Sequence, residues 1–184
     1  MKSNVTMQNE DHLFTSEDKM SWFGYGEWVE EPDIVEFTYK GHQCKVFRVV
    51  AREPYARPVC MFGGHLCGYV RVPADHPYHY KKFEDMEIDC HHGLTWGECS
   101  NGHWIGFDCA HSTDYVPSME KLKRTDESLI AIRQMFPIPE QFRDLALFNP
   151  TYKNVNYCIE ECKGIVDQLI VIAEAFESED QKPL

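Results

Sequence analysis

The feature that most constrains the fold is an amphipathic pattern near the end of the chain. Apolar residues recur there at steps of three and four, namely Val155, Ile159, Cys162, Val166, Leu169, Ile170, Ala173 and Phe176. Charged residues fill the opposite face at Glu160, Lys163, Asp167 and Glu174. This spacing predicts one helix of about five or six turns. Its apolar face has to be buried against a second layer of structure.

Short β-type segments precede this helix and can supply that layer. Residues 34–39 (IVEFTY) and 43–50 (QCKVFRVV) flank Lys40-Gly41 and predict a hairpin. Further strands are expected over residues 66–72, 86–91 and 103–109, and a charged segment over 117–135 is expected to form a helix. The predicted fold class is α+β: a mostly antiparallel sheet with the long C-terminal amphipathic helix packed on it.

The length of 184 residues suits one domain. We expect a polar N-terminal arm over residues 1–20, a single α+β domain over 21–177 and a polar tail over 178–184. The first residues have no apolar core of the signal-peptide type, and no window approaches the roughly 18 apolar residues that a membrane helix needs. These features predict a cytoplasmic protein without a membrane partner. An exposed sheet edge and a long helix are also compatible with a homodimer.

The charge balance restricts the partners. The chain has 30 acidic and 18 basic residues, for a formal net charge of −12. Extended nucleic acid is excluded as a partner, because duplex binding needs a positive surface. A small anionic ligand is not excluded, since a few local cationic groups can hold a phosphate. The arginines expected to do so are Arg48, Arg52, Arg57 and Arg71.

Polar chemistry concentrates in residues 89–114, DCHHGLTWGECSNGHWIGFDCAHSTD. Seven of the nine histidines lie between residues 65 and 111. The eight cysteines include no C-x₂-C pair, which argues against a structural zinc site, and most of them lie in apolar runs typical of buried free thiols. A single divalent metal ion held by ligands from separate segments stays open, although no cofactor is required.

Two histidine–carboxylate combinations stand out in this segment. Asp89 and His91 share one face of an extended strand, and His111 lies between Asp108 and Asp114. A histidine oriented by a carboxylate is the usual general acid/base pair. The same arrangement can bind a ligand or simply lock a loop. Two such pairs beside a glycine-rich turn favour a functional site.

Aromatic side chains surround the same segment, at Tyr69, Tyr78, Tyr80, Trp96, Trp104 and Tyr115. Each one is suited to core packing. As a group, beside histidine, aspartate and glycine-rich turns, they suit a pocket for a flat, polar, phosphorylated small molecule.

Several ordered segments resemble a family of small proteins encoded by phages and scattered through bacterial genomes. Its hallmarks are CGYV-x-VP-x₂-HP, HGGLT and GFDCAH-x-GD, which correspond here to CGYVRVPADHP, HHGLT and GFDCAHSTD. The resemblance covers about residues 25–170. It implies a central site lined by histidine, aspartate and threonine, with its polar residues at His76, His91, Thr95, Asp108, His111 and Asp114. His92 and Thr113 stand where the family usually has glycines.

Three functions follow as hypotheses. The first is a phage-type counter-defence protein in the host cytoplasm that sequesters a nucleotide-derived signal, such as a cyclic dinucleotide or an ADP-ribose-type molecule. Its ligand-binding residues would be His76, Tyr78, His91, Thr95, Trp96, Asp108, His111 and Asp114. The second is a hydrolase or phosphodiesterase that cleaves such a molecule with His91, His111 and Asp108 as catalytic residues. The third is a protein-binding module without a small-molecule site.

Overall fold

A computed structural model describes residues 5–52, 61–99, 102–119 and 150–180. Six strands form one antiparallel sheet in the order β1-β2-β3-β4-β6-β5. They are β1 Val5–Asp11, β2 Ile34–Tyr39, β3 His42–Arg52, β4 Met61–Val72, β5 Trp96–Glu98 and β6 His103–Asp108. The helices are α1 Ser16–Phe23 and α4 Val155–Asp180, with 3-10 turns η1 Glu27–Val29 and η2 Phe83–Asp85. The helix expected over 117–135 falls almost entirely outside the described residues.

The central hairpin is confirmed. β2 and β3 pair from Tyr39↔His42 to Ile34↔Phe47. The turn between them needs two residues with positive φ, and Lys40 (φ 48°) and Gly41 (φ 86°) supply them. Alternate side chains then face one layer, where they are buried.

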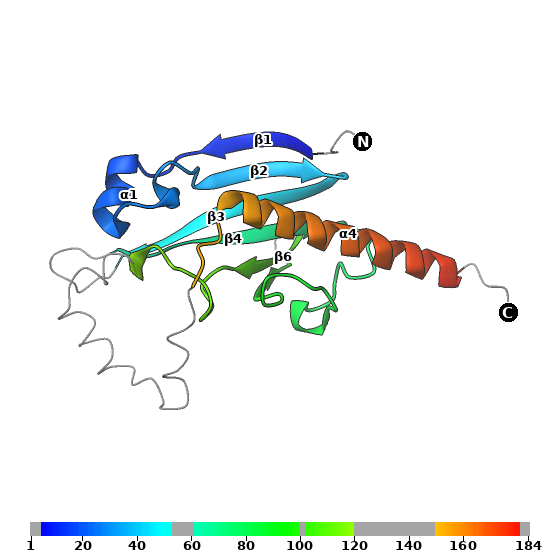
Figure 1. Cartoon of the computed structure of the whole chain (residues 1–184). Helices are drawn as coiled ribbons and strands as arrows, with labels where there is room; N and C mark the ends of the chain where they lie inside the picture. The colour runs from blue at the N-terminus through cyan, green and yellow to red at the C-terminus, as the bar shows by residue number, and fades with distance from the viewer. Residues whose placement is uncertain (1–4, 53–60, 100–101, 120–149, 181–184) are drawn as a thin grey trace, which may run out of the picture.

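The long C-terminal helix is also confirmed, and the fold is α+β as predicted. Helix α4 lies across the sheet, and its C-terminal half projects past the strands (Figure 1). Its start is capped by Asn154, whose side-chain oxygen accepts the Tyr157 N–H at 3.0 Å. The shared core consists of Phe37, Cys44, Val46, Leu66, Val70, Ile105 and Phe107 from the sheet and Cys158, Cys162, Ile165, Val166 and Leu169 from the helix.

Close approach of helix and sheet depends on one glycine. A Cβ atom at Gly68 in β4 would lie 2.4 Å from the Phe107 ring and 2.9 Å from Cys162 Sγ. The apolar face of α4 is buried only as far as the sheet extends. Beyond it Phe176, a residue of the predicted apolar face, is 51% exposed, so this face continues past the core. Among the described residues, no helix is both long and apolar enough to cross a membrane.

The N-terminal segment differs from the expected polar arm over 1–20. Residues Val5–Asp11 form edge strand β1, which pairs with β2, and Ser16 begins helix α1 behind a Thr15/Asp18 capping box. An edge strand exposes most of its side chains, so it lacks the alternating apolar pattern that marks a strand in sequence. At the other end α4 extends to Asp180, which places the first residues of the expected polar tail in the helix.

The strand expected over 86–91 does not form. Met86 and Ile88 are buried and Glu87 and Asp89 are exposed, as the alternation indicated. The extended backbone runs beside α4 instead of beside another strand. The Gln168 side chain accepts the Asp89 N–H at 2.7 Å and donates to the Asp89 carbonyl at 2.7 Å. A helix side chain therefore takes the place of a neighbouring strand.

Candidate functional site

Two turns bring three histidines together at one end of α4. The first turn closes with a hydrogen bond from Gly93 N–H to the Cys90 carbonyl at 2.9 Å. It is tied to α4 by the His91 N–H, which donates to Glu161 Oε2 at 2.8 Å. The second turn follows β6 and closes from Asp114 N–H to the His111 carbonyl at 2.9 Å. We call the set His91, His92, His111, Thr113 and Asp114 the histidine centre.

Asp114 organises this centre. Asp114 is 2% exposed, and its two carboxylate oxygens lie 3.0 and 2.9 Å from His91 Nε2. It also accepts the His111 N–H at 2.9 Å. Burial alone would raise the pKa of Asp114, but the hydrogen bonds from His91 and His111 outweigh burial and hold the pKa below its ordinary value. The carboxylate is therefore the anionic anchor of the centre.

The second nitrogen of His91 is occupied as well. His91 Nδ1 lies 2.9 Å from the Tyr157 hydroxyl of α4. Burial and the neighbouring Glu161 carboxylate raise the pKa of Tyr157, which keeps the phenol protonated. With partners at both ring nitrogens, the His91 ring is fixed in position.

His92 adopts an unusual backbone conformation. Its φ of 55° lies in the left-handed region, which L-residues other than glycine rarely occupy. Its ring stacks on His111 with centroids 4.4 Å apart and planes at 23°. His92 Nε2 lies 2.9 Å from Thr113 Oγ1. His92 of the first turn and Thr113 of the second turn thus contact each other.

The His111 ring nitrogen Nδ1 has no hydrogen bond in the described structure, although the atom is buried. It lies 3.4 Å from Asp114 Oδ2 and 3.8 Å from Asp108 Oδ1. Ring nitrogens of His91, His92 and His111 all lie within 4.8 Å of one another. This cluster could hold a metal ion.

His76 and Tyr78 lie elsewhere. His76 Nε2 donates to the Leu169 carbonyl at 2.8 Å, and its Nδ1 accepts the Tyr78 N–H at 3.0 Å. Leu169 is about 18 Å along α4 from Tyr157 at the ordinary helix rise. Both side chains are buried and hold the 73–79 loop against the helix, so they do not join the histidine centre.

Trp96 is also separate from the centre, and the exposed Thr95 before it is tied to β6 by its backbone N–H, which donates to the Gly106 carbonyl at 2.9 Å. Trp96 pairs with Gly106 and packs edge-on against Tyr69 at 5.2 Å. The neighbouring Phe107 faces α4, so Trp96 lies on the opposite face of the sheet by strand alternation. Of the eight expected ligand residues, the structure gathers His91, His111 and Asp114, with Asp108 at the edge. The expected pairing of Asp89 with His91 is not present, since His91 bonds to Asp114.

Sequence reasoning missed Tyr157 as a member of the site. Tyr157 and Glu161 lie one helical turn apart, so they share a face of α4. Tyr157 bonds to His91 Nδ1, and Glu161 accepts the His91 backbone N–H. That spacing was readable in the sequence, but nothing in it linked the helix to the histidine segment.

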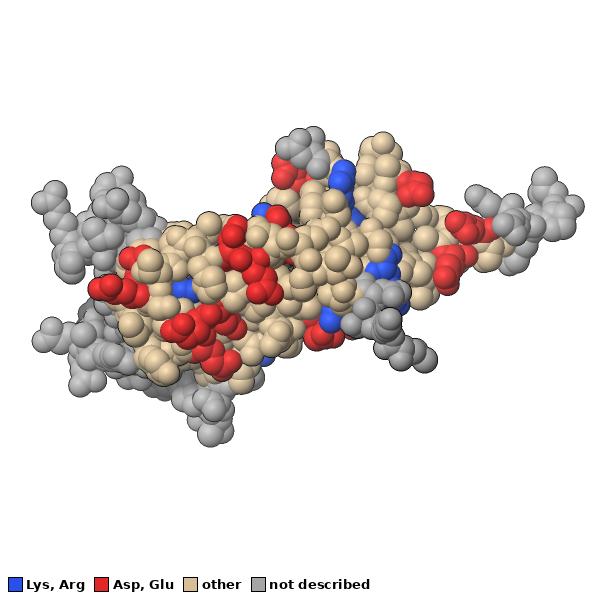
Figure 2. Space-filling model, turned by 90° about the horizontal axis from the view of Figure 1, so that it is seen from above, with Lys and Arg blue, Asp and Glu red and all other residues tan. Residues whose placement is uncertain are grey.

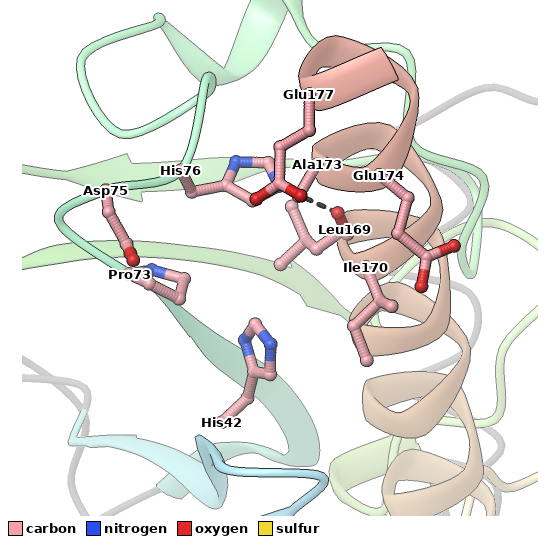
Figure 3. Close-up of a pocket in the computed structure, with 9 residues that line it drawn as sticks. All are labelled: His42, Pro73, Asp75, His76, Leu169, Ile170, Ala173, Glu174 and Glu177. Carbon is pink, nitrogen blue, oxygen red and sulfur yellow. Dashed lines mark hydrogen bonds between the residues drawn. The ribbon is translucent and has the colours of Figure 1, made fainter. Parts of the chain in front are cut away.

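Two cavities among the described residues have acidic linings. One of about 240 Å³ is lined by His42, Pro73, Asp75, His76, Leu169, Ile170, Ala173, Glu174 and Glu177 (Figure 3). Another of about 600 Å³ has five glutamates, Glu10, Glu27, Glu30, Glu31 and Glu160, in its lining. Acidic side chains also gather on the face shown in Figure 2. Their charge opposes a phosphate in either cavity.

Arg48 is not available for a phosphate. It is fully buried and donates to Asp33 Oδ1 at 2.7 Å and to Glu31 Oε2 at 3.0 Å. Arg71 is exposed and donates a hydrogen bond to Gln43. Arg57 and the side chain of Arg52 lie outside the described part of the structure. Of the four arginines expected to bind phosphate, Arg48 therefore has a structural role instead.

Comparisons of the chain with protein-family models, with curated proteins and with solved structures find no match. The histidine centre is therefore the feature of this protein from which a function can be inferred.

Proposed function

We propose that this protein binds a phosphorylated, nucleotide-derived small molecule at the histidine centre and keeps it from its receptor. In this role it would act as a phage-type counter-defence protein in the cytoplasm of a bacterial host. The observation that carries the proposal is the convergence of three imidazoles at a partly open surface: His92 is exposed, and the His111 side chain is 25% exposed. Imidazole N–H groups donate to phosphate oxygens, and His92 and His111 are the rings placed to do so, because His91 is bonded at both ring nitrogens.

The surroundings support the same location. The cavities at the far end of α4 and beside β1 are lined with carboxylates. Arg48 is committed to buried ion pairs. Within the described residues, the histidine centre is the cluster that offers imidazole donors to an anion, with the buried Asp114 carboxylate facing His91 and His111 inside it.

Hydrolysis of the bound molecule is the second candidate. His111 lies between the carboxylates of Asp108 and Asp114, at 3.8 and 3.4 Å from its Nδ1. A histidine flanked in this way can act as a general base. His91 is less suited to proton transfer, because both of its ring nitrogens are bonded. A single divalent metal ion would supply the charge that neutralises a phosphoryl oxygen.

Binding of a basic protein partner is the third candidate. The observation in its favour is the cavity of about 600 Å³ with five glutamates in its lining. In a chain of net charge −12, such a surface favours cationic partners.

The test exposes the purified protein to a panel of cyclic dinucleotides and ADP-ribose-type molecules, then filters it and analyses the flow-through by HPLC. For sequestration, one compound disappears with wild type and returns intact when the protein is heated. The His111→Ala protein leaves it in solution, and His12→Ala, which alters an exposed histidine far from the centre in sequence, behaves as wild type. New products identify hydrolysis. A panel that passes through unchanged contradicts both small-molecule functions.

A further inference from the structure

We infer that His91, His92 and His111 form a binding site for a first-row transition-metal ion of the zinc type, and that His92 is the ligand that completes it. This goes beyond the proposed function, because the ion binds whether or not a nucleotide is present. The primary observation is that one ring nitrogen from each histidine lies within 4.8 Å of the others. Nitrogen ligands bound to one tetrahedral ion at about 2.0–2.1 Å lie about 3.3 Å apart, so the three rings have to turn toward a common point and the stacked pair of His92 and His111 has to open.

The donor set selects the class of ion. Three imidazole nitrogens suit Zn²⁺, Co²⁺, Ni²⁺ and Cu²⁺. Mg²⁺ and Ca²⁺ prefer oxygen ligands, so they are expected to bind weakly here. Three protein ligands leave one tetrahedral position open, as at catalytic zinc sites.

The carboxylate of Asp114 behaves as the outer partner of such a site. It is buried and contacts His91 Nε2 at 2.9 Å while accepting the His111 backbone N–H. Ligating histidines are commonly oriented by a carboxylate in this way. Among the described residues, the buried His111 Nδ1 atom has no hydrogen-bond partner and only carboxylate oxygens at 3.4 and 3.8 Å, a setting in which a cation can take the place of a hydrogen bond. His91 has to exchange one of its two ring hydrogen bonds for the ion.

The backbone of His92 gives an independent argument. Its φ of 55° is one of two positive values among the described non-glycine residues, and the other, Lys40, lies in a hairpin turn. A large side chain at such a strained position points to a role for the side chain. Thr113 Oγ1, 2.9 Å from His92 Nε2, holds the ring beside His111.

The experiment titrates metal-free, full-length protein with Co²⁺ and follows the visible absorption of cobalt bound to nitrogen ligands. We expect saturation at one equivalent, displacement by Zn²⁺ and no displacement by millimolar Mg²⁺. His92→Gly and His92→Ala, on an exposed turn, should each weaken Co²⁺ binding by at least about ten-fold, the scale of losses from disturbed metal sites. Thr113→Val should weaken it less.

Controls separate this site from adventitious binding. His12→Ala removes an exposed histidine outside the centre and should bind Co²⁺ as wild type does, and Ser112→Ala is the matched control for Thr113→Val. Thermal unfolding of each apo variant checks that the fold is kept. The inference is overturned by the absence of a cobalt band, by His92 variants that bind as tightly as wild type, or by a His12→Ala protein that loses affinity equally. Because no nucleotide is used, this result is independent of the ligand panel.

Discussion

Single residues in the histidine centre combine backbone cost with side-chain contacts. His92 occupies a left-handed conformation next to Gly93, whose φ is 87°. For an L-residue this conformation costs roughly 1–2 kcal/mol relative to the right-handed one. The hydrogen bond of His92 to Thr113 and its stacking on His111 offset this conformational cost.

The His92 backbone can be tested apart from its side chain by comparing two variants. Both His92→Gly and His92→Ala remove the imidazole, but only glycine relieves the left-handed conformation. We expect His92→Gly to exceed His92→Ala in unfolding free energy by about 1 kcal/mol. Urea denaturation measures the difference.

The matched control is Gly164 in α4, where an added Cβ would meet nothing within 4 Å. In this helical position Gly164→Ala should raise the unfolding free energy by about 0.5–1 kcal/mol, so alanine is preferred over glycine here, the reverse of the expectation at position 92. Equal stability of the two His92 variants would contradict the assigned conformation.

The lowered pKa of Asp114 predicts that the free energy of unfolding decreases at acid pH. Its folded pKa lies below the ordinary value of 3.8, so folding favours the ionised form. The contribution is therefore complete above the ordinary value and is lost as the pH falls through the lower folded pKa. Unfolding free energies measured from pH 6 to pH 2.5 should show a shallower acid decline in Asp114→Asn than in wild type. The exposed Asp89→Asn serves as control, and identical slopes for wild type and Asp114→Asn would refute the prediction.

At the scale of elements, α4 replaces a strand for the segment 86–91. Alternating burial at Met86 and Ile88 is the pattern of a strand. The backbone hydrogen bonds go to the Gln168 amide and to the Glu161 carboxylate instead. Because its backbone is held by α4, His91 lies where its side chain contacts Asp114.

Gln168→Ala removes both hydrogen bonds to Asp89 at once. We expect a loss of about 1 kcal/mol in unfolding free energy and faster hydrogen exchange at the Asp89 amide. Hydrogen-exchange NMR or mass spectrometry reports the local effect. Glu174→Ala, at an exposed position of the same helix, should leave exchange in 86–93 unchanged. Unaltered exchange in Gln168→Ala would argue that the segment is held by apolar packing alone.

For the whole molecule, a buried ionic network joins the N-terminal region to the sheet and to the entry of α4. Lys19, Asp33 and Arg48 are all fully buried. Arg48 also donates to Tyr152 at 2.9 Å, and Glu31 accepts from Tyr152 at 2.6 Å and from the N–H of Val155 at 3.1 Å. Loss of one member leaves its partners charged and buried.

Arg48→Met should therefore be strongly destabilising, by about 3–5 kcal/mol. Methionine fills most of the volume but leaves the Asp33 carboxylate with fewer partners. Chemical denaturation provides the measurement. Arg71→Met, at an exposed arginine of β4, should change stability by less than about 0.5 kcal/mol. Similar losses for the two variants would show that the network is not a stabilising unit.

Local periodicity predicted much of the fold. The hairpin, the strands at 66–72 and 103–109, and the C-terminal helix all follow from spacings of two or of three and four residues along one segment. The sequence also indicated the segment that forms the histidine centre, because His91, His111 and Asp114 lie in the stretch singled out by its histidine content.

Tertiary structure decided the partners. Periodicity reports which face of a segment is apolar, but a hydrogen-bond partner distant in the chain leaves no local pattern. Residues 86–91 therefore resembled a strand although Gln168 and Glu161 hold them, and polar β1 gave no strand signal because its neighbour β2 supplies the pairing. For the same reason His76 and Trp96 looked equivalent to His91 in sequence. The sheet and α4 distribute them over separate surfaces and bring His92 beside His111, since side-chain proximity is a property of the packed elements.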